Sequence, residues 1–133
     1  MQTFLPSEDF RTSAKMLDNK RLGKQRVEAK QIYNIVSTNR TTGGWVNHPA
    51  VKMWRGFPDA LAHYHNEMID EWVSRGFKNN MPLLAHNPYY CRPTWVTDQR
   101  VHSSHRANLI RKDSTFYGQY GWTEDPSTPY FWP

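Results

Sequence analysis

The stretch LDNKRLGKQRVEAKQIYNIV, residues 17–36, has the spacing of a long amphipathic helix. Its apolar residues recur at three- and four-residue steps, as one side of a helix requires. They are Leu22, Ala29, Ile32, Tyr33 and Val36. We therefore expect this helix to pack against a core along that stripe.

One carboxylate of this helix, Glu28, lies among five basic residues. Arg21, Lys24 and Glu28 follow one another at three- and four-residue steps, which places them on one face, away from the apolar stripe. The simpler interpretation of the helix alone is a solvated face, with Lys24 and Glu28 in an ion pair worth about 0.2–0.5 kcal/mol. The other interpretation makes Glu28 a catalytic centre with cations around it. The five basic residues are Lys20, Arg21, Lys24, Arg26 and Lys30.

Length and composition indicate a folded chain with a polyanionic partner. The 133 residues are 38% hydrophobic and 22% charged, which predicts one domain over residues 1–133 with a true core. The net charge is +5, and the first 52 residues carry nine basic and four acidic groups. A basic balance of this kind favours DNA or a nucleotide as partner. An aromatic content of 14% supplies core pieces or surfaces for base stacking.

Cysteine content and hydropathy bear on the compartment. The single cysteine, Cys91, excludes an intrachain disulfide and is typical of a reducing compartment. No apolar run has the length that crosses a membrane, and the N-terminus lacks the apolar stretch of a signal peptide. We therefore expect a cytoplasmic protein without membrane contact.

The remaining pattern predicts a compact all-α, single-domain helical bundle with an irregular, aromatic-rich C-terminal tail. Ser7 is the expected cap of a first helix, and Asn47 of a short helix that contains Pro49. A further helix is expected from Pro58 to Arg75, stopped by Gly76 and with an apolar stripe that includes Val73. The last helix is expected to end near residue 113. Prolines make residues 77–95 irregular, and the tail should wrap over the helices as a lid, with stacking on bases as the alternative use of Tyr117, Tyr120 and Trp122.

The six histidines invite comparison with a metal site. His102 and His105 lie three residues apart on one helix and would need further ligands from elsewhere to hold an ion. Neutral imidazole rings both donate and accept hydrogen bonds, so His48, His102 and His105 fit the polar lining of a pocket better. We expect neither a metal nor another cofactor.

A different chemistry suits one carboxylate surrounded by cations. An amine can attack C1′ of a nucleotide, expel the base and leave a Schiff base, while a carboxylate stabilises the cationic intermediate and moves protons. An α-amino group suits the attack better than a lysine, because its ordinary pKa is about 7.7–8.0 against about 10.4. The cations would hold phosphates.

Six short motifs carry a resemblance that covers Leu17 to Trp122. They are LD, RVEA, GGWVNHPAV, EWVSRGF, HRANLIRKD and FYGQYGW. In this order they resemble the small all-helical pyrimidine-dimer DNA glycosylase/AP lyase family typified by a phage endonuclease V. The resemblance implies that Glu28 is the catalytic glutamate, that Arg106 contacts phosphate or substrate, and that His48 lies beside the pocket.

This chain departs from the family pattern at two places. The arginine expected just before the glutamate is replaced by Val27, with Arg26 one place earlier. The family nucleophile is the amine exposed by removal of the initiator methionine, but Gln2 is too bulky for ordinary trimming. The amine of Met1, or that of Lys20 or Lys24, would then have to serve.

Three functions remain open on the sequence. The favoured one is a metal-free glycosylase/AP lyase that acts on a damaged or modified base flipped out of DNA. The second is a protein that binds or hydrolyses a small nucleotide in the same basic pocket, and the third is a scaffold with a basic face. The expected catalytic residues are Glu28 and Met1, and the expected substrate-binding residues are Arg21, Lys24, Arg26, Trp45, Asn47, His48, His102, His105 and Arg106.

Overall fold

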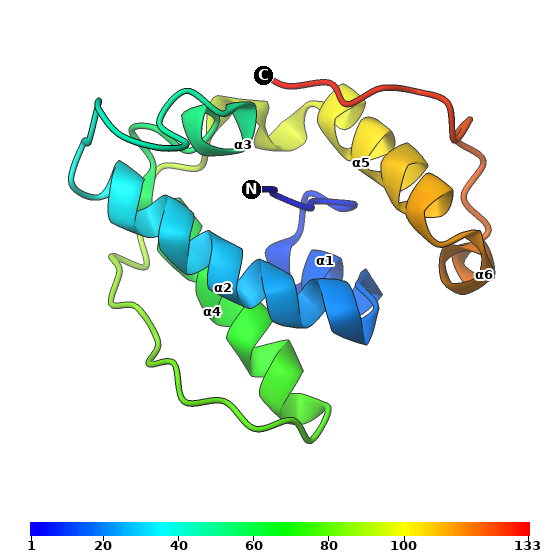
Figure 1. The fold of residues 1–133 in the computed structure, drawn as a ribbon, viewed down its shortest axis with the longest axis horizontal. Coiled ribbons are helices and arrows are strands. Elements are labelled where there is room, and N and C mark those ends of the chain that lie inside the picture. Colours follow the sequence, from blue (N-terminus) through cyan, green and yellow to red (C-terminus); the bar gives the residue numbers. More distant parts are fainter.

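The computed structural model describes residues 1–133 and confirms the all-α fold (Figure 1). Aspartates cap three of the helices, since Asp9, Asp98 and Asp113 each accept a backbone N–H of the first turn. The helices are α1 (Phe10–Met16), α2 (Asn19–Val36), α3 (Pro49–Lys52), α4 (Pro58–Ser74), α5 (Gln99–Lys112) and α6 (Ser114–Tyr117), and the two 3-10 turns are η1 (Thr94–Thr97) and η2 (Gly118–Tyr120).

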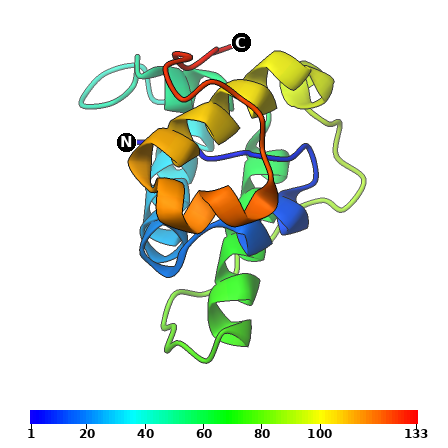
Figure 2. The same ribbon diagram turned by 90° about the vertical axis from the view of Figure 1, so that its right-hand side faces the viewer.

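The helices enclose the N-terminal segment. α2 and α4 cross in contact, and α5 lies on the opposite side of the molecule with α6 at its end (Figures 1 and 2). Residues 1–6 run between α2 and α5 in extended form. A cluster of 23 buried apolar residues joins these elements, with Trp54, Tyr64 and Tyr117 as its largest fully buried side chains.

The apolar stripe of α2 lies in the core, as expected. Leu22, Ala29, Ile32 and Val36 are at most 3% exposed, and Tyr33, the fifth residue of the stripe, is partly buried against the core. Gly23 permits close packing against α4, because a Cβ there would lie 2.7 Å from Cζ3 of Trp72. The helix starts at Asn19 after the Asp18 cap residue, so the expected start at Leu17 is two residues early.

Two expected helix caps are wrong, and the reason is local in both cases. Asp9, not Ser7, caps α1, because its carboxylate accepts from the N–H of Thr12 at 3.1 Å. The hydroxyl of Ser7 instead accepts from the N–H of Asp9. At α3 the cap is His48 in place of Asn47, since Nδ1 of its ring accepts from the N–H of Ala50 at 3.0 Å.

α4 follows the expected pattern except near its end. Leu61, His65 and Met68 are fully buried, whereas Val73 is 51% exposed because the last turn extends beyond the core. Gly76 follows the helix with φ +89, the left-handed conformation of a C-terminal glycine. The irregular residues 77–93 return beside α4, where the amide of Asn66 bonds both backbone groups of Leu84.

The C-terminal tail covers the core, as expected. Its first residues form α6 and η2, which the proline and glycine content did not predict. Tyr117 is fully buried and donates to the Asp18 carboxylate at 2.5 Å, which excludes it as a base-stacking residue. Residues 130–132 are partly buried against the same core. None of the helices combines the length and apolar character that a membrane span needs.

Candidate active site

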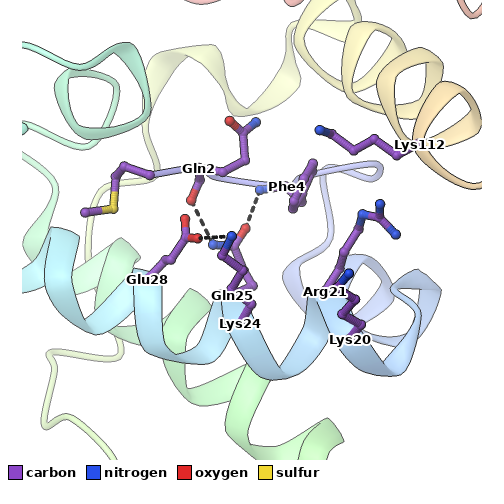
Figure 3. A pocket seen from close by; sticks show the side chains of 9 residues that line it. Gln2, Phe4, Lys20, Arg21, Lys24, Gln25, Glu28 and Lys112 are labelled. Atoms are coloured by element: carbon purple, nitrogen blue, oxygen red, sulfur yellow. Dashed lines mark hydrogen bonds and ion pairs between the residues drawn. The ribbon is translucent and has the colours of Figure 1, made fainter.

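A cavity of about 250 Å³ lies between the N-terminal segment, α2 and the end of α5 (Figure 3). α2 contributes five polar side chains to it, and α5 contributes one lysine. Glu28 lies at one end, while Arg21 and Lys112 lie at the other. The lining residues are Met1, Gln2, Phe4, Lys20, Arg21, Lys24, Gln25, Glu28 and Lys112.

Glu28 is buried, which is inconsistent with a solvated helix face. The residue is 8% exposed, and its Oε2 is enclosed without a hydrogen-bond partner. Its Oε1 lies 3.6 Å from Nζ of Lys24, whose side chain is 75% exposed. A buried carboxylate oxygen without a donor is costly to a fold. Glu28 is therefore a buried carboxylate at the cavity, with one oxygen paired to Lys24 and the other without a donor.

Side chains of α2 and α4 hold the backbone of the N-terminal segment beside Glu28. The amide of Gln25 accepts from the N–H of Phe4 at 2.6 Å and donates to the carbonyl of Gln2 at 2.8 Å. The hydroxyl of Tyr64 donates to the carbonyl of Phe4 at 2.6 Å. These buried bonds replace the secondary structure that the segment lacks.

α5 holds the next part of the same segment. Nδ1 of His105 accepts from the N–H of Leu5 at 2.8 Å, and Nδ1 of His102 lies 2.8 Å from the carbonyl of Leu5. Arg106 donates to the carbonyl of Pro6 at 2.8 Å. Both backbone groups of Leu5 are thus bound by buried imidazoles.

The two histidines of α5 are core residues that face the chain, not the cavity. Both are fully buried. Burial lowers the pKa of His105 to about 3, with the neighbouring His102 as the second cause, so the ring is neutral and free to accept from Leu5. Nε2 of His102 lies 2.6 Å from the carbonyl of Val96. The sequence predicted that these histidines line a pocket, whereas in the structure they anchor the N-terminal segment at Leu5.

His48, the cap residue of α3, is affected by charges at the Glu28 end of the cavity. Its pKa is lowered first by burial and next by the positive α-amino group of Met1, while Glu28 opposes the shift. The hydroxyl of Thr3 donates to the carbonyl of Ala50 at 3.2 Å, which holds the N-terminal segment against the helix that His48 caps. The ring also meets Trp45 edge-on, with centroids 5.8 Å apart. Met1 and Glu28 thus line one cavity, and His48 lies at the start of the neighbouring helix α3.

Three other expected site residues lie elsewhere. Arg26 stacks on Trp72 at 4.9 Å and bonds Asn79, on the side of α2 that faces α4. Arg106 pairs with Glu124 and lines a separate cavity of about 570 Å³. Asn47 is exposed beside His48 and outside the cavity lining.

Two residues that line the cavity, Lys112 and Gln25, were not among the site residues predicted from the sequence. Lys112 at the end of α5 points toward the N-terminal segment, across from Arg21. Desolvation first, and then the charges of Arg21, Arg111 and Lys24, lower the pKa of Lys112. Gln25 was missed because a glutamine in a polar stretch gives no sign of burial. The charge run at residues 111–112 was the one available signal for Lys112.

The histidines and acids form no group of three that could hold a metal ion. His102 and His105, the pair considered for one, are bound to Leu5 through ring nitrogens. His63 bonds Tyr90 at 2.6 Å and Glu67 at 3.2 Å.

Comparison with known proteins identifies the family of this chain. A family model described as pyrimidine dimer DNA glycosylase matches residues 1–85, which include Met1, Glu28 and His48. No curated protein and no solved structure matches the chain. The match covers more than half of the sequence, and the site lies mostly within it. The chain belongs to the pyrimidine dimer DNA glycosylase family.

Proposed function

We propose that this protein is a DNA glycosylase/AP lyase in which the α-amino group of Met1 is the nucleophile and Glu28 moves the protons. The anchored N-terminal segment is the observation that supports this most directly. Five of its backbone groups are bound by Gln25, Tyr64, His102 and His105. Holding an irregular segment in this way fixes the position of its end, which lies near a buried carboxylate that lacks a donor.

The amine of Met1 and the carboxylate of Glu28 suffice for the bond changes of this reaction. The amine lone pair forms a bond to C1′, the glycosidic bond breaks, and its electron pair leaves with the base, which takes up a proton. The nitrogen then gives one proton to Glu28, and its lone pair forms C=N as the C1′–O4′ bond breaks. O4′ takes the electrons of that bond and the proton from Glu28, which leaves a protonated Schiff base. Glu28 removes a proton from C2′, a C2′–C3′ double bond forms, and the 3′ phosphate leaves with the electrons of the C3′–O bond. The charge of Glu28 also stabilises the cationic intermediates.

The cations at the far end of the cavity fit the phosphates of the damaged strand. Lys20 and Lys112 have no acidic partner, whereas Arg21 lies 3.3 Å from Asp18 and Lys24 lies 3.6 Å from Glu28. Unpaired cations gathered at one cavity repel one another until an anion enters. In this proposal the phosphate binds at one end of the cavity and the reacting sugar at the other.

The anchoring residues then act as positioning residues. His102, His105 and Arg106, expected to touch substrate, hold Leu5 and Pro6 in this proposal. His48, which burial favours in the neutral form, is available to exchange protons beside the amine.

The test is covalent trapping on DNA. Duplexes with one cyclobutane pyrimidine dimer or one abasic site are incubated with the protein and sodium borohydride, which reduces a Schiff base to a stable amine. We expect an adduct that peptide mass spectrometry maps to the α-amino group of Met1. A variant with one glycine added before Met1 moves the amine by about 3.8 Å and should trap far more slowly. An adduct on Lys20 or Lys24 would reassign the nucleophile, and no adduct would refute the lyase.

Salt dependence separates duplex binding from binding of a small nucleotide. Each phosphate neutralised contributes about −0.9 to the slope of log affinity against log salt. Replacing Lys20 and Lys112 by methionine should reduce that slope by about 1 to 2, whereas Lys78→Met, an exposed change beyond α4, should leave it unchanged. A slope near zero for the unchanged protein would favour the small-nucleotide alternative.

A further inference from the structure

Trp45 combines two unusual properties. Its φ is +69, a left-handed backbone conformation that large side chains rarely adopt. Its side chain is also among the largest exposed apolar groups, at 56% exposed. Backbone strain of this kind persists where the surroundings enforce it, and it concentrates at functional positions.

Two arginines hold the loop that presents Trp45. Arg40 donates to the carbonyl of Gly44 at 3.3 Å. Arg55 donates to the carbonyls of Arg40 at 2.6 Å and Val46 at 3.2 Å. The loop is thus fixed on both sides of Trp45, which keeps the indole in solvent instead of letting it fold onto the core.

The position and charge of this loop favour a nucleic-acid partner. The indole contacts the ring of His48, which caps α3, and the hydroxyl of Thr3 donates to the carbonyl of Ala50 in that helix. Trp45 therefore lies beside the N-terminal segment that lines the proposed active site. Residues 29–58 contain four basic side chains and no acidic one. An exposed aromatic ring within a positive surface suits a nucleobase better than a protein or lipid partner.

We propose that Trp45 stacks on a base of the duplex at the lesion and fills the gap left when a nucleotide is flipped out. This inference rests on the proposed function, because it requires a DNA substrate with an extruded nucleotide. Flipping removes stacking partners from the neighbouring bases, and an aromatic ring held rigidly at the surface replaces them. Trp45 would then distinguish damaged from intact duplex.

The experiment measures affinity for two duplexes of one sequence, one with a tetrahydrofuran abasic analogue and one undamaged. The analogue cannot form a Schiff base, so the readout does not depend on the chemistry. Trp45→Leu keeps apolar bulk but lacks the ring, and should lower the ratio of the two affinities about 10-fold to 100-fold. Trp45→Phe should retain most of the ratio. Tyr89→Leu removes an aromatic side chain that is 92% exposed on another part of the surface, and should change nothing.

Trp45→Gly supplies a second, independent readout. Glycine adopts φ +69 without strain, so the variant should unfold at the same temperature as the parent or higher, while it loses the preference for the abasic analogue. An unchanged ratio in Trp45→Leu would overturn the stacking role. An absence of borohydride trapping by the parent, with the ratio still dependent on Trp45, would refute the lyase and leave the stacking role supported.

Discussion

The two buried faces of α2 differ in what covers them. The apolar face, with Leu22, Ala29 and Ile32, packs against the core. The opposite face is polar, and it is buried at Gln25 and Glu28 because residues 1–6 lie over it. One face stabilises the fold through burial of apolar area. The other binds an irregular segment through directed hydrogen bonds, and it leaves one carboxylate oxygen without a donor.

Under the proposed function, this difference separates stability from catalysis along a single helix. Burial of a polar side chain costs free energy unless its hydrogen bonds are made. Gln25 makes them with the N-terminal segment, whereas Glu28 makes none. We therefore expect substitutions on the two faces to have opposite effects on unfolding and on catalysis.

The largest expected effect is on the polar face. Glu28→Gln keeps the shape but removes the charge and the base, so the rate of abasic-site cleavage should fall about 10²-fold to 10⁴-fold. Stability should be unchanged or higher, because the change removes the charge of a buried carboxylate whose only ion-pair partner, Lys24, is mostly exposed. Single-turnover cleavage and thermal unfolding on the same preparation measure both quantities.

The matched control is Asp70→Asn, which exchanges a carboxylate for an amide at an exposed position of α4. It should affect neither quantity. Normal cleavage by Glu28→Gln would show that Glu28 has no catalytic part.

The next effect is on the apolar face. Ile32 is 1% exposed, and Ile32→Ala should lower the free energy of unfolding by about 2–5 kcal/mol through lost burial and a cavity. The cleavage rate per folded molecule, measured well below the unfolding temperature, should not change. A rate loss equal to that of Glu28→Gln would mean that the two faces are not separable.

The sequence predicted the apolar face because its signal is local. Ile32 and its neighbours repeat at helical spacing, and so do the buried residues of α4 up to Met68. The polar face had no such signal, since its cover is a segment without periodicity. Glu28 was singled out by the charges around it and by a family resemblance, and its burial could not be predicted from either.

Long-range contacts explain the other differences between the predicted and the observed surroundings of side chains. His102 and His105 were recognised as a pair, but their partner Leu5 lies about a hundred residues away in the chain. Arg106 was expected to contact phosphate or substrate, and its guanidinium pairs with Glu124 of the tail, a partner that no local sequence pattern indicates. Val73 fits the helical stripe of α4 and yet is exposed, because periodicity does not show where the core ends.

The free energy of unfolding should also depend on pH, because His105 helps to hold residues 1–6 over the polar face of α2. Burial lowers the pKa of His105 to about 3 in the folded state, against an ordinary value of 6.5. Between these values the unfolded chain binds the extra proton. Stability is therefore fully present above pH 6.5 and should fall below it, by up to about 1.4 kcal/mol per pH unit.

Urea unfolding at pH 7, 6 and 5 measures this slope. His105→Asn, whose side-chain oxygen can accept from Leu5 in place of Nδ1, should fold at pH 7 and show a shallower slope. His86→Asn, a change in the irregular segment, should keep the parent slope. Equal slopes in all three proteins would mean that His105 binds its proton equally well in the folded and in the unfolded state.

The smallest expected effect concerns Gly23, where α2 meets α4. Alanine gains about 1 kcal/mol in helix propensity, but its Cβ would lie 2.7 Å and 2.9 Å from two ring carbons of Trp72. That ring is held by Phe77, stacked at 4.3 Å, and by a hydrogen bond from Nε1 to the carbonyl of Lys78. Overpacking costs about 1–3 kcal/mol, so Gly23→Ala should destabilise the protein by roughly 1 kcal/mol in all.

A double-mutant cycle isolates the cause of that effect. In a Trp72→Leu background the clash is absent, and the same Gly23→Ala change should stabilise the protein by up to about 1 kcal/mol. Cleavage should be unaffected by Gly23→Ala, because the clash lies on the side of α2 away from Glu28. An identical cost in both backgrounds would show that Gly23 is required for a reason other than the approach of Trp72.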